Sequence, residues 1–370
     1  MANSSEVLVI GAGPAGIASA IAARLKGLEV TIADARRPPI HKACGEGLLP
    51  EGVSALRRLG IEFTSDVAHP FTGLCFRDHA ASAFAHFPNA PAFGVRRTTL
   101  NQILLERAEN LGVKFLWGAR LTSLSIGSAR LNDELFHFRW LVGADGYNSQ
   151  VRKLAGLDSF QWYKSSRFGF RRHFRIAPWS DFVEVYWGDG FQVFVTPTGR
   201  EEVCVSLFTS HPRFRLSQGI ASFPALASML RHATPADAEL GSVTSLRNSR
   251  RAARGRIALV GDASCSVDGI AGQGLSLAFQ QALSLADALS AADLASYAAA
   301  HHQITENARR MTGLLLVMSR SGWIRRKILR LFSSRPEVFS RMIALHTGPQ
   351  SGQALGARAV IQLTFQMLGG

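Results

Sequence analysis

A glycine-rich turn directly after a short apolar run, near the start of the chain, constrains the fold more than any other feature. The apolar run is Val7–Ile10, and the turn consists of Gly11, Ala12, Gly13, Pro14, Ala15 and Gly16. The run predicts a buried parallel strand. Glycines at this spacing allow a tight turn, a close backbone approach to a pyrophosphate and close packing of a helix expected over residues 17–25. A second strand over residues 28–33 ends at Asp34, 18 residues beyond Gly16, where a carboxylate can bind a ribose hydroxyl. Residues 6–34 are therefore predicted to form a dinucleotide-binding β-α-β unit.

Length and composition exclude several classes of protein. The chain has 370 residues, 47% of them hydrophobic, which is enough for a large core in two domains. No apolar stretch reaches the roughly 18 residues that a membrane span needs, and a polar start that enters a strand at once predicts no signal peptide. The 11 histidines lack metal-ligand spacing, so no metal site is expected. The cysteines lack a CxxC pair and predict a reduced cytoplasmic protein without disulfides: Cys44, Cys75, Cys204 and Cys265.

The net charge of +14 is concentrated in residues 167–175, 247–256 and 320–341. A positive surface attracts anionic partners, although a solvated basic face is the default interpretation of each cluster alone. Aromatic residues alternate with basic ones over residues 167–175, a pattern that can stack on single-stranded nucleic acid. It is confined to one expected strand and no nucleic-acid motif accompanies it, so we expect no nucleic-acid partner.

Hydrophobic periodicity divides the rest of the chain. Helices are expected over residues 51–59, 98–111 and 275–289, and strands over residues 113–116, 140–142 and 256–260, with a hairpin pair over 120–139. Residues 160–210 alternate with period two and are rich in aromatic and β-branched side chains, which predicts an antiparallel sheet whose aromatic face roofs a pocket. The nucleotide-binding domain is therefore predicted to be discontinuous.

Two further glycine–aspartate signatures complete the fingerprint. One is Leu141–Gly146, followed by Ser149 and Arg152. The other is Gly261-Asp262-Ala263 with Gly272-Gln273-Gly274-Leu275 after it. Over residues 6 to about 290, the three motifs together resemble FAD-dependent class A monooxygenases of the p-hydroxybenzoate hydroxylase type and their relatives, the geranylgeranyl reductases and flavin-dependent halogenases.

The resemblance implies an α/β fold. It consists of a Rossmann-type, glutathione reductase-like FAD-binding domain with an inserted antiparallel β-sheet substrate domain and a helical C-terminal tail. Residues 1–75, 95–155 and 250–310 would form the FAD-binding domain, residues 76–94 and 160–245 the β-rich domain, and residues 311–370 the basic tail. Only one fingerprint is present, so FAD would stay bound while NAD(P)H visits transiently.

The resemblance also implies which residues hold FAD: Gly11, Gly13, Pro14, Ala15, Gly16, Asp34, Arg97, Asp145, Gly261, Asp262, Gly272 and Gly274. Asp262 would accept a hydrogen bond from the ribityl chain, and Asp145 would lie near the pyrophosphate and be linked to NAD(P)H use. Arg97 would open a helix over the cofactor, with Arg96 as a competing assignment. Backbone N–H groups at the start of the helix after Gln273 can stabilise negative charge on a reduced flavin.

The loop Lys42–Leu48 resembles the cysteine–glycine loop that lies near the flavin in the geranylgeranyl reductase branch. The residues expected at the flavin face, as catalytic candidates, are Cys44, Gly272, Gln273 and Gly274. Those expected in the substrate pocket are Lys42, Tyr186, Trp187 and Phe194. A structural role for the loop, with glycines for a tight turn and Cys44 as a small filler, remains an alternative.

Departures from the related motifs favour oxygenation. The strand Phe194–Thr198 lacks the paired aromatic residues of the reductases, and the WxWxIP motif of the halogenases is absent. The loop over residues 268–274 resembles the oxygenase form, although its usual proline is missing. We therefore expect an NAD(P)H-dependent monooxygenase that hydroxylates an aromatic or lipid- or polyketide-like molecule through a flavin C4a-hydroperoxide. The alternatives are a reductase of isoprenoid double bonds and a non-catalytic flavin-fold module that binds a membrane surface or a partner.

The tail carries a basic amphipathic pattern over residues 314–332. Ile324, Ile328 and Leu331 share one helical face, while Arg326 and Arg330 lie elsewhere. Such a helix can lie on an anionic membrane, or it can pack on the FAD domain. The expected location is the cytoplasm, with peripheral attachment to the inner face of the membrane as the alternative, and an apolar small molecule is the expected substrate.

Overall fold

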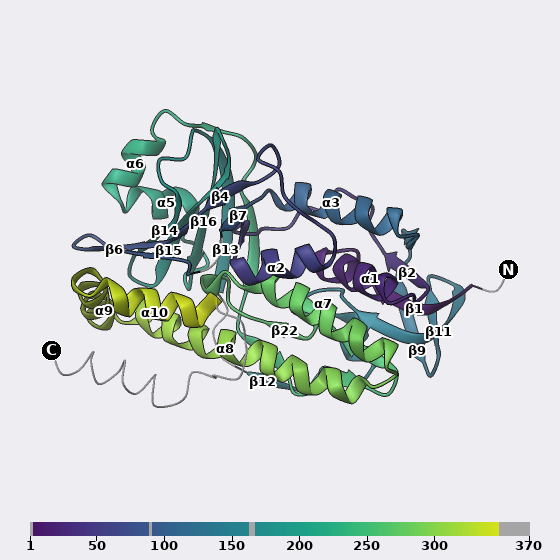
Figure 1. Cartoon of the computed structure of the whole chain (residues 1–370). Coiled ribbons are helices and arrows are strands. Elements are labelled where there is room, and N and C mark those ends of the chain that lie inside the picture. The colour runs from purple at the N-terminus through teal and green to yellow at the C-terminus, as the bar shows by residue number, and fades with distance from the viewer. Residues whose placement is uncertain (1–2, 89–90, 163–166, 348–370) are drawn as a thin grey trace.

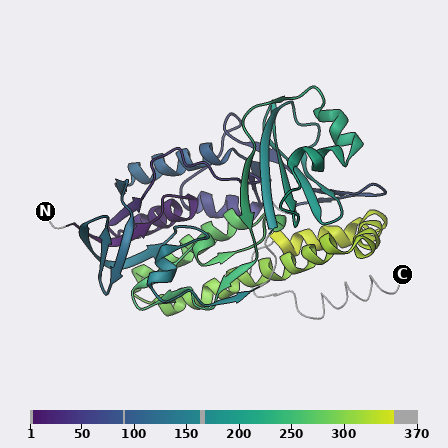
Figure 2. The ribbon, with the colours of Figure 1, turned by 180° about the vertical axis from the view of Figure 1, so that it is seen from behind.

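The computed structural model describes residues 3–88, 91–162 and 167–347. Two large sheets lie at opposite ends of the molecule, and long helices run beneath both (Figure 1). Seen from behind, helix α8 (Leu294–Arg320) runs along one edge from the first sheet to the second, where the last helices lie (Figure 2). Within the described residues, no helix combines the length and apolar character that crossing a membrane requires.

The first sheet contains the predicted nucleotide-binding unit. Its parallel strands follow the order β21 (Ile257–Leu259), β11 (Glu134–Gly143), β1 (Ser4–Ile10), β2 (Val30–Asp34) and β8 (Lys114–Trp117), with β20 (Ala253–Arg254) antiparallel at one edge. One face packs on α1 (Pro14–Leu25), α3 (Arg97–Asn110) and α7 (Gly274–Ser290). The other face is covered by β9 (Leu121–Ser125), β10 (Ser128–Leu131) and α4 (Gln150–Leu154). Both faces are buried, which explains the unbroken apolar run at Val7–Ile10.

The second sheet is mainly antiparallel. Its order is β17 (Thr234–Pro235), β13 (Arg167–Arg175), β16 (Glu202–Thr209), β15 (Phe191–Gly199), β14 (Phe182–Trp187), β5 (Gly73–Arg77) and β6 (Ser82–His86), and β18 (Leu240–Thr244) also pairs with β13. One face packs on α5 (Leu216–Ala221) and α6 (Pro224–Leu230). The opposite face packs on α8, α9 (Gly322–Ser334) and α10 (Pro336–Thr347).

Short elements connect the two sheets. One small sheet contains β3 (Gly47–Leu48), β7 (Ala92–Gly94) and β4 (His69–Phe71), and another contains β12 (Phe160–Trp162), β19 (Arg247–Ser249) and β22 (Cys265–Ser266). Helix α2 (Pro50–Arg58) packs on α7, and the 3-10 turns η1 (Gly261–Ala263) and η2 (Gly269–Ala271) precede that helix.

The predicted helices are present with small shifts in their ends, but two predicted domain boundaries cut through elements. Helix α1 begins at Pro14 because proline suits the first turn of a helix. Strand β5 pairs with β14 and belongs to the second sheet, so the boundary after residue 75 is wrong. Helix α8 continues through the boundary after residue 310. Residues 348–370 of the predicted tail lie outside the described residues.

The amphipathic pattern of the tail forms α9. Ile328 is buried, and Ile324 and Leu331 pack partly against the same apolar cluster, which includes Phe332. Arg325 is buried as well and donates hydrogen bonds to the Gly188 carbonyl and to Asp189. The apolar face of α9 thus packs against the protein itself, and attachment to an anionic membrane through residues 314–332 stays a prediction.

Candidate cofactor and substrate site

A cavity of about 870 Å³ lies between the two sheets. The predicted site residues line it, except Gly16 and Tyr186. We call the part formed by the fingerprint turn, Asp34, Asp145 and Asp262 the nucleotide end. We call the remaining apolar walls the apolar end, which comprises Leu74, Phe76, Val183, Val185, Trp187, Phe194, Met311, Leu315, Met342 and Ile343.

The fingerprint glycines have distinct roles in the structure. A Cβ on Gly16 would lie 1.9 Å from the Gly11 carbonyl oxygen, and one on Gly11, whose φ is +111°, would lie 2.5 Å from the Ala144 oxygen. These two glycines therefore permit close backbone packing. A Cβ on Gly13 would meet no described atom within 4 Å, so Gly13 borders open space where a phosphate can approach the backbone.

Two helices begin at the cavity without a side-chain cap from any described residue. Helix α1 has Gly13 at its N-cap, α7 has Gln273, and neither helix has an acidic residue in its first turn. The first N–H groups of a helix lack intrahelical partners and carry partial positive charge. The start of α1 thus suits a pyrophosphate, and the start of α7, after Gly272 in a left-handed conformation, suits a second anionic group.

The aspartates of the nucleotide end already make local contacts. Asp34 accepts hydrogen bonds from the backbone N–H groups of Ala12 and Arg36, both at 2.8 Å. One oxygen of Asp145 accepts from the backbone N–H groups at 150 and 151, and the other oxygen has no partner among the described residues. Each aspartate therefore orders its own turn, and the predicted contacts of both with FAD stay predictions.

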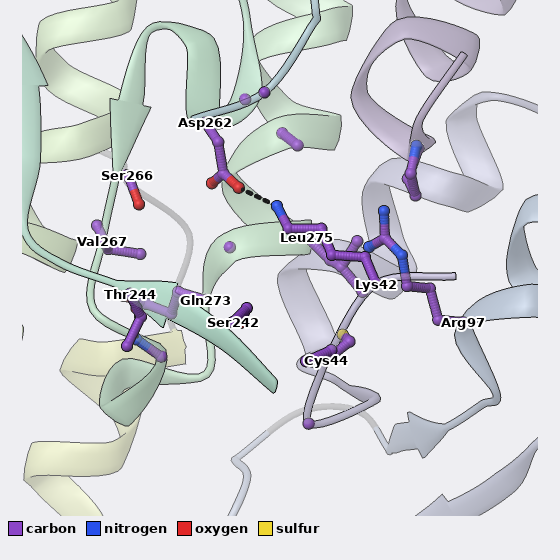
Figure 3. A pocket seen from close by; sticks show the side chains of 18 of the residues that line it. Lys42, Cys44, Arg97, Ser242, Thr244, Asp262, Ser266, Val267, Gln273 and Leu275 are labelled. Carbon is purple, nitrogen blue, oxygen red and sulfur yellow. Dashed lines mark hydrogen bonds and ion pairs between the residues drawn. The ribbon is translucent and has the colours of Figure 1, made fainter. Parts of the chain in front are cut away.

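Asp262 and Lys42 form an ion pair of 2.7 Å across the cavity (Figure 3). Burial opposes ionisation of Asp262, but Lys42 and then Arg97 outweigh it and lower the pKa of the carboxyl group. Lys42 was expected in the substrate pocket, and here it contacts a candidate cofactor ligand. Of the two competing arginines, Arg97 lines the cavity, and Arg96 instead forms an ion pair with Glu202.

Trp187 and Phe194 line the apolar end, but the prediction for Tyr186 is wrong. Successive residues of a strand point to opposite faces, so β14 cannot turn both Tyr186 and Trp187 toward the cavity. The Tyr186 hydroxyl donates to Glu184 at 2.6 Å, and its ring packs 5.3 Å from that of Phe223 on the far face. Alternation from Trp187 back to Val185 and Val183 was the signal that could have identified this wall.

A group of charges, which we call the Glu46 clamp, joins the buried Glu46 and His173 to the half-buried Asp237. His173 Nε2 lies 2.5 Å from Glu46 Oε2, and His173 Nδ1 lies 2.8 Å from Asp237 Oδ2. Both ring nitrogens face carboxylate oxygens, an arrangement that favours the protonated ring, an imidazolium that can donate to both. Burial opposes this charge, but Glu46 and Asp237 outweigh it and raise the pKa of His173. No sequence motif indicated this clamp, because its members lie far apart in the chain.

Glu46 fixes the loop that carries Cys44. Its second carboxylate oxygen accepts the backbone N–H of Arg97 at 3.0 Å, and its carbonyl accepts the N–H of Val95 at 3.0 Å. Its φ of +61° is unusual for a residue with a side chain and indicates a conformation that the surroundings enforce. The half-buried Cys44, which accepts the Glu46 N–H at 3.4 Å, is thereby held at the cavity wall.

The basic pattern on β13 is not a solvated face. Arg167, Arg171 and His173 are buried, and the aromatic residues between them, Phe168 and Phe170, are only partly buried. Arg171 pairs with Asp237, and Arg167 lies 3.6 Å from Asp268. Ligand atoms of Glu46, His173 and Cys204 lie within 4.8 Å of one another, and both nitrogens of His173 already face carboxylate oxygens.

Known proteins resemble this chain in sequence and fold. A family model described as FAD binding domain matches residues 4–310. A menaquinone reductase of Mycolicibacterium smegmatis is 29% identical over 180 residues, which cover 46% of this chain and 43% of that protein, so the chain matches less than half of its length. A kynurenine 3-monooxygenase of Xanthomonas axonopodis pv. citri is 28% identical over 79% of this chain and 73% of that protein. A triple mutant of the flavin-dependent brominase Bmp2 has the same fold, with a TM-score of 0.81, 16% identity and 99% coverage of both chains.

Proposed function

This chain belongs to the FAD-binding-domain family, in the superfamily of class A monooxygenases and geranylgeranyl reductase-like flavoproteins, and from that premise we propose that it is an NAD(P)H-dependent monooxygenase of apolar molecules. Its substrate would be an aromatic or lipid- or polyketide-like compound. The observation that carries the proposal is one cavity that extends from the fingerprint turn, past the starts of α1 and α7, to the apolar end.

The residues of the nucleotide end fit FAD. Gly13 leaves room for a phosphate beside the backbone, and the start of α1 provides free N–H groups for it. The N–H groups at Gly274 and Leu275 can stabilise negative charge on a reduced isoalloxazine ring. Bound FAD, once reduced by NAD(P)H, supplies the activation of oxygen, and the protein supplies position and electrostatic support.

The apolar end would keep water away from reacting atoms placed there. Sheet residues such as Phe76 and Trp187 face helix residues such as Leu315 and Met342 in one buried cluster. A site without free water protects reactive intermediates from hydrolysis and strengthens electrostatic interactions. These walls also favour a substrate that buries mainly apolar surface.

The experiment uses the purified yellow protein with NADH or NADPH and a panel of phenolic and polyprenyl compounds. We expect an active compound to stimulate nicotinamide oxidation and oxygen consumption together, with a product heavier by one oxygen atom. Nicotinamide oxidation that proceeds without oxygen and yields a product heavier by two hydrogens would contradict oxygenation.

The second candidate is reduction of an isoprenoid double bond. The menaquinone reductase match favours it, because that relative is 29% identical to this chain over 180 residues. The anaerobic arm of the same experiment, with a polyprenyl quinone, is the test of this candidate.

A further inference from the structure

Helix α9 has one side buried in the protein and one side in contact with solvent. It lies at the end of the molecule opposite the N-terminus and packs on both α8 and α10 (Figure 1). Ile328, Leu329 and Phe332 of this helix are buried in the apolar cluster against the second sheet. The apolar side of α9 is therefore occupied by the protein, and a partner must meet the opposite side.

The side of α9 that meets solvent is basic and aromatic. Trp323, Arg326, Lys327 and Arg330 follow the spacing i, i+3, i+4 and i+7, which places them on one face of the helix. We call these four residues the α9 basic face. Trp323 is 55% exposed, Arg326 and Arg330 are exposed, and the partly exposed Lys327 places its ammonium group 4.4 Å from the centre of the Trp323 ring. A large exposed aromatic ring thus lies among three cations.

No ion pair with a described carboxylate neutralises the α9 basic face. From Arg320 to Arg341 the sequence contains one acidic residue, Glu337, which lies in the first turn of α10. Asp189, an exposed residue of the second sheet, pairs with the buried Arg325 on the other side of α9. The three cations of the face have no such partner among the described residues. Their charge therefore remains available to an anionic partner.

Two observations favour a lipid surface over nucleic acid as that partner. Tryptophan is typical of the boundary between lipid headgroups and acyl chains, because its ring is apolar and its N–H group is polar. The helices on either side of α9 line the apolar end of the cavity, α8 with Met311 and Leu315, and α10 with Met342 and Ile343. Docking through α9 therefore keeps this end of the cavity close to a bilayer, in which apolar molecules dissolve.

We propose that the α9 basic face holds the protein on a membrane surface that contains anionic phospholipids. Arg326, Lys327 and Arg330 contact the lipid phosphates, and Trp323 enters the headgroup region. The protein lies on the bilayer through the outer face of a helix that is already packed, without inserting the apolar side of that helix. Each cation contributes about fivefold to the partition onto anionic lipid, and the three together contribute about 100-fold.

Cosedimentation of the flavin-loaded protein with lipid vesicles tests the proposal. The vesicles contain phosphatidylcholine alone, or phosphatidylcholine and phosphatidylglycerol in equal parts. We expect binding to the anionic vesicles alone, and a loss of this binding when the salt concentration is raised from about 0.05 M to about 0.5 M. Equal binding to the two kinds of vesicle, or binding to neither, would overturn the proposal.

Charge-matched variants locate the contact. The triple variant Arg326→Gln, Lys327→Gln and Arg330→Gln should lower the partition onto anionic vesicles about 100-fold. The control removes three exposed arginines that lie away from α9, two on α2 and one after α6: Arg57→Gln, Arg58→Gln and Arg231→Gln. This control should bind within about twofold of wild type, because salt screens charges that lie far from the lipid. Equal losses for the two variants would reduce the effect to net charge and overturn the assignment to α9.

Tryptophan fluorescence reports the contact in the wild-type chain. Anionic vesicles should shift the emission of Trp323 to shorter wavelength, and the shift is assigned by its loss in Trp323→Phe. An unshifted emission at saturating vesicle concentration would contradict the proposal. Tighter binding to duplex DNA at the same phosphate concentration would assign the face to nucleic acid instead. Vesicle binding is measured without substrate or nicotinamide, so its outcome does not depend on the proposed function.

Discussion

The nucleotide end of the cavity is built from short stretches that carry recognisable motifs, whereas the apolar end is assembled from two helices and several strands far apart in the chain. At the nucleotide end, Gly11, Gly13 and Gly16 act through their backbone, and spacing along the chain determines their positions. At the apolar end, side chains such as Phe76, Val185 and Met342 act through contacts between elements. A site that acts through its backbone can therefore be recognised from a local motif, whereas a site that depends on contacts between distant side chains cannot.

The largest expected effect distinguishes two glycines of the nucleotide end, Gly16 and Gly13. Gly16→Ala places a methyl group 1.9 Å from a backbone oxygen, so we expect a loss of about 5 kcal/mol or more in the free energy of unfolding, and no bound flavin. Gly13→Ala, whose methyl group meets open space, should fold normally but bind flavin poorly. Thermal melting and flavin absorbance check both variants. Equal melting temperatures for them would contradict the distinction.

The next effect concerns the Glu46 clamp, whose Glu46 lines the cavity. His173→Ala removes the imidazolium of the Glu46 clamp and leaves Glu46 buried without its counter-charge, which should cost about 3 kcal/mol of unfolding free energy. Urea unfolding of the flavin-loaded protein measures this cost. The half-exposed ion pair between Lys26 and Asp287 provides the control, since Lys26→Met should cost under about 1 kcal/mol. A comparable cost for both variants would show that the Glu46 clamp stabilises the fold no more than a surface ion pair does.

A smaller effect is the pH dependence of the stability that the Glu46 clamp provides. The pKa of His173 is raised in the folded protein, so its stabilising contribution is complete below the unfolded value and is lost as pH rises through the folded pKa. The difference in unfolding free energy between wild type and Glu46→Gln should therefore shrink as pH rises above neutrality. Asp237 acts in the opposite direction, because its pKa is lowered to about 2 and its contribution is lost only in strong acid. If this difference in unfolding free energy grows from pH 7 to pH 9, His173 is not the charged partner of Glu46.

The smallest effect sharpens the comparison at two adjacent residues. Tyr186→Phe removes the hydrogen bond to Glu184 on the far face and should cost about 1 kcal/mol of stability without altering substrate binding. Trp187→Phe changes the cavity wall and should alter the affinity for an active compound of the phenolic panel. Titration of both variants with that compound, followed by flavin absorbance, is the measurement, and a change in affinity for Tyr186→Phe would return that residue to the pocket.

Local sequence was sufficient for the first sheet and for the nucleotide end. The fingerprint predicted β1, α1 and β2, and the run Gly261-Asp262-Ala263 lies at the same cavity, as expected. It was insufficient for β14, where residues 183–187 are all buried. With both faces covered, burial does not show which face meets the cavity, and Tyr186 was misplaced although it alternates with Val185 and Trp187 along the strand.

The clamp and the helical wall were missed for a different reason. The arginines and histidine of β13 are buried because Asp237, Asp268 and Glu46 neutralise them, and these partners lie far away along the chain. A basic, aromatic strand with distant partners reads as a solvated face until the partners are known. The hydrogen bond from His346 to the Ala271 carbonyl is likewise recognisable only once α10 is placed against the loop before α7.

Helix α8 links the two ends through one continuous run of backbone. Near its start the Tyr297 hydroxyl donates to the Leu259 carbonyl of the first sheet, and near its end Ser319 accepts from Gln192 of the second sheet. One residue inserted between these anchors would rotate everything beyond it by about 100°. Met311 and Leu315 would then leave the cavity while the fingerprint turn stayed intact. Substrate choice in such a chain can thus evolve by a change in helix length, with every cofactor ligand left as it was.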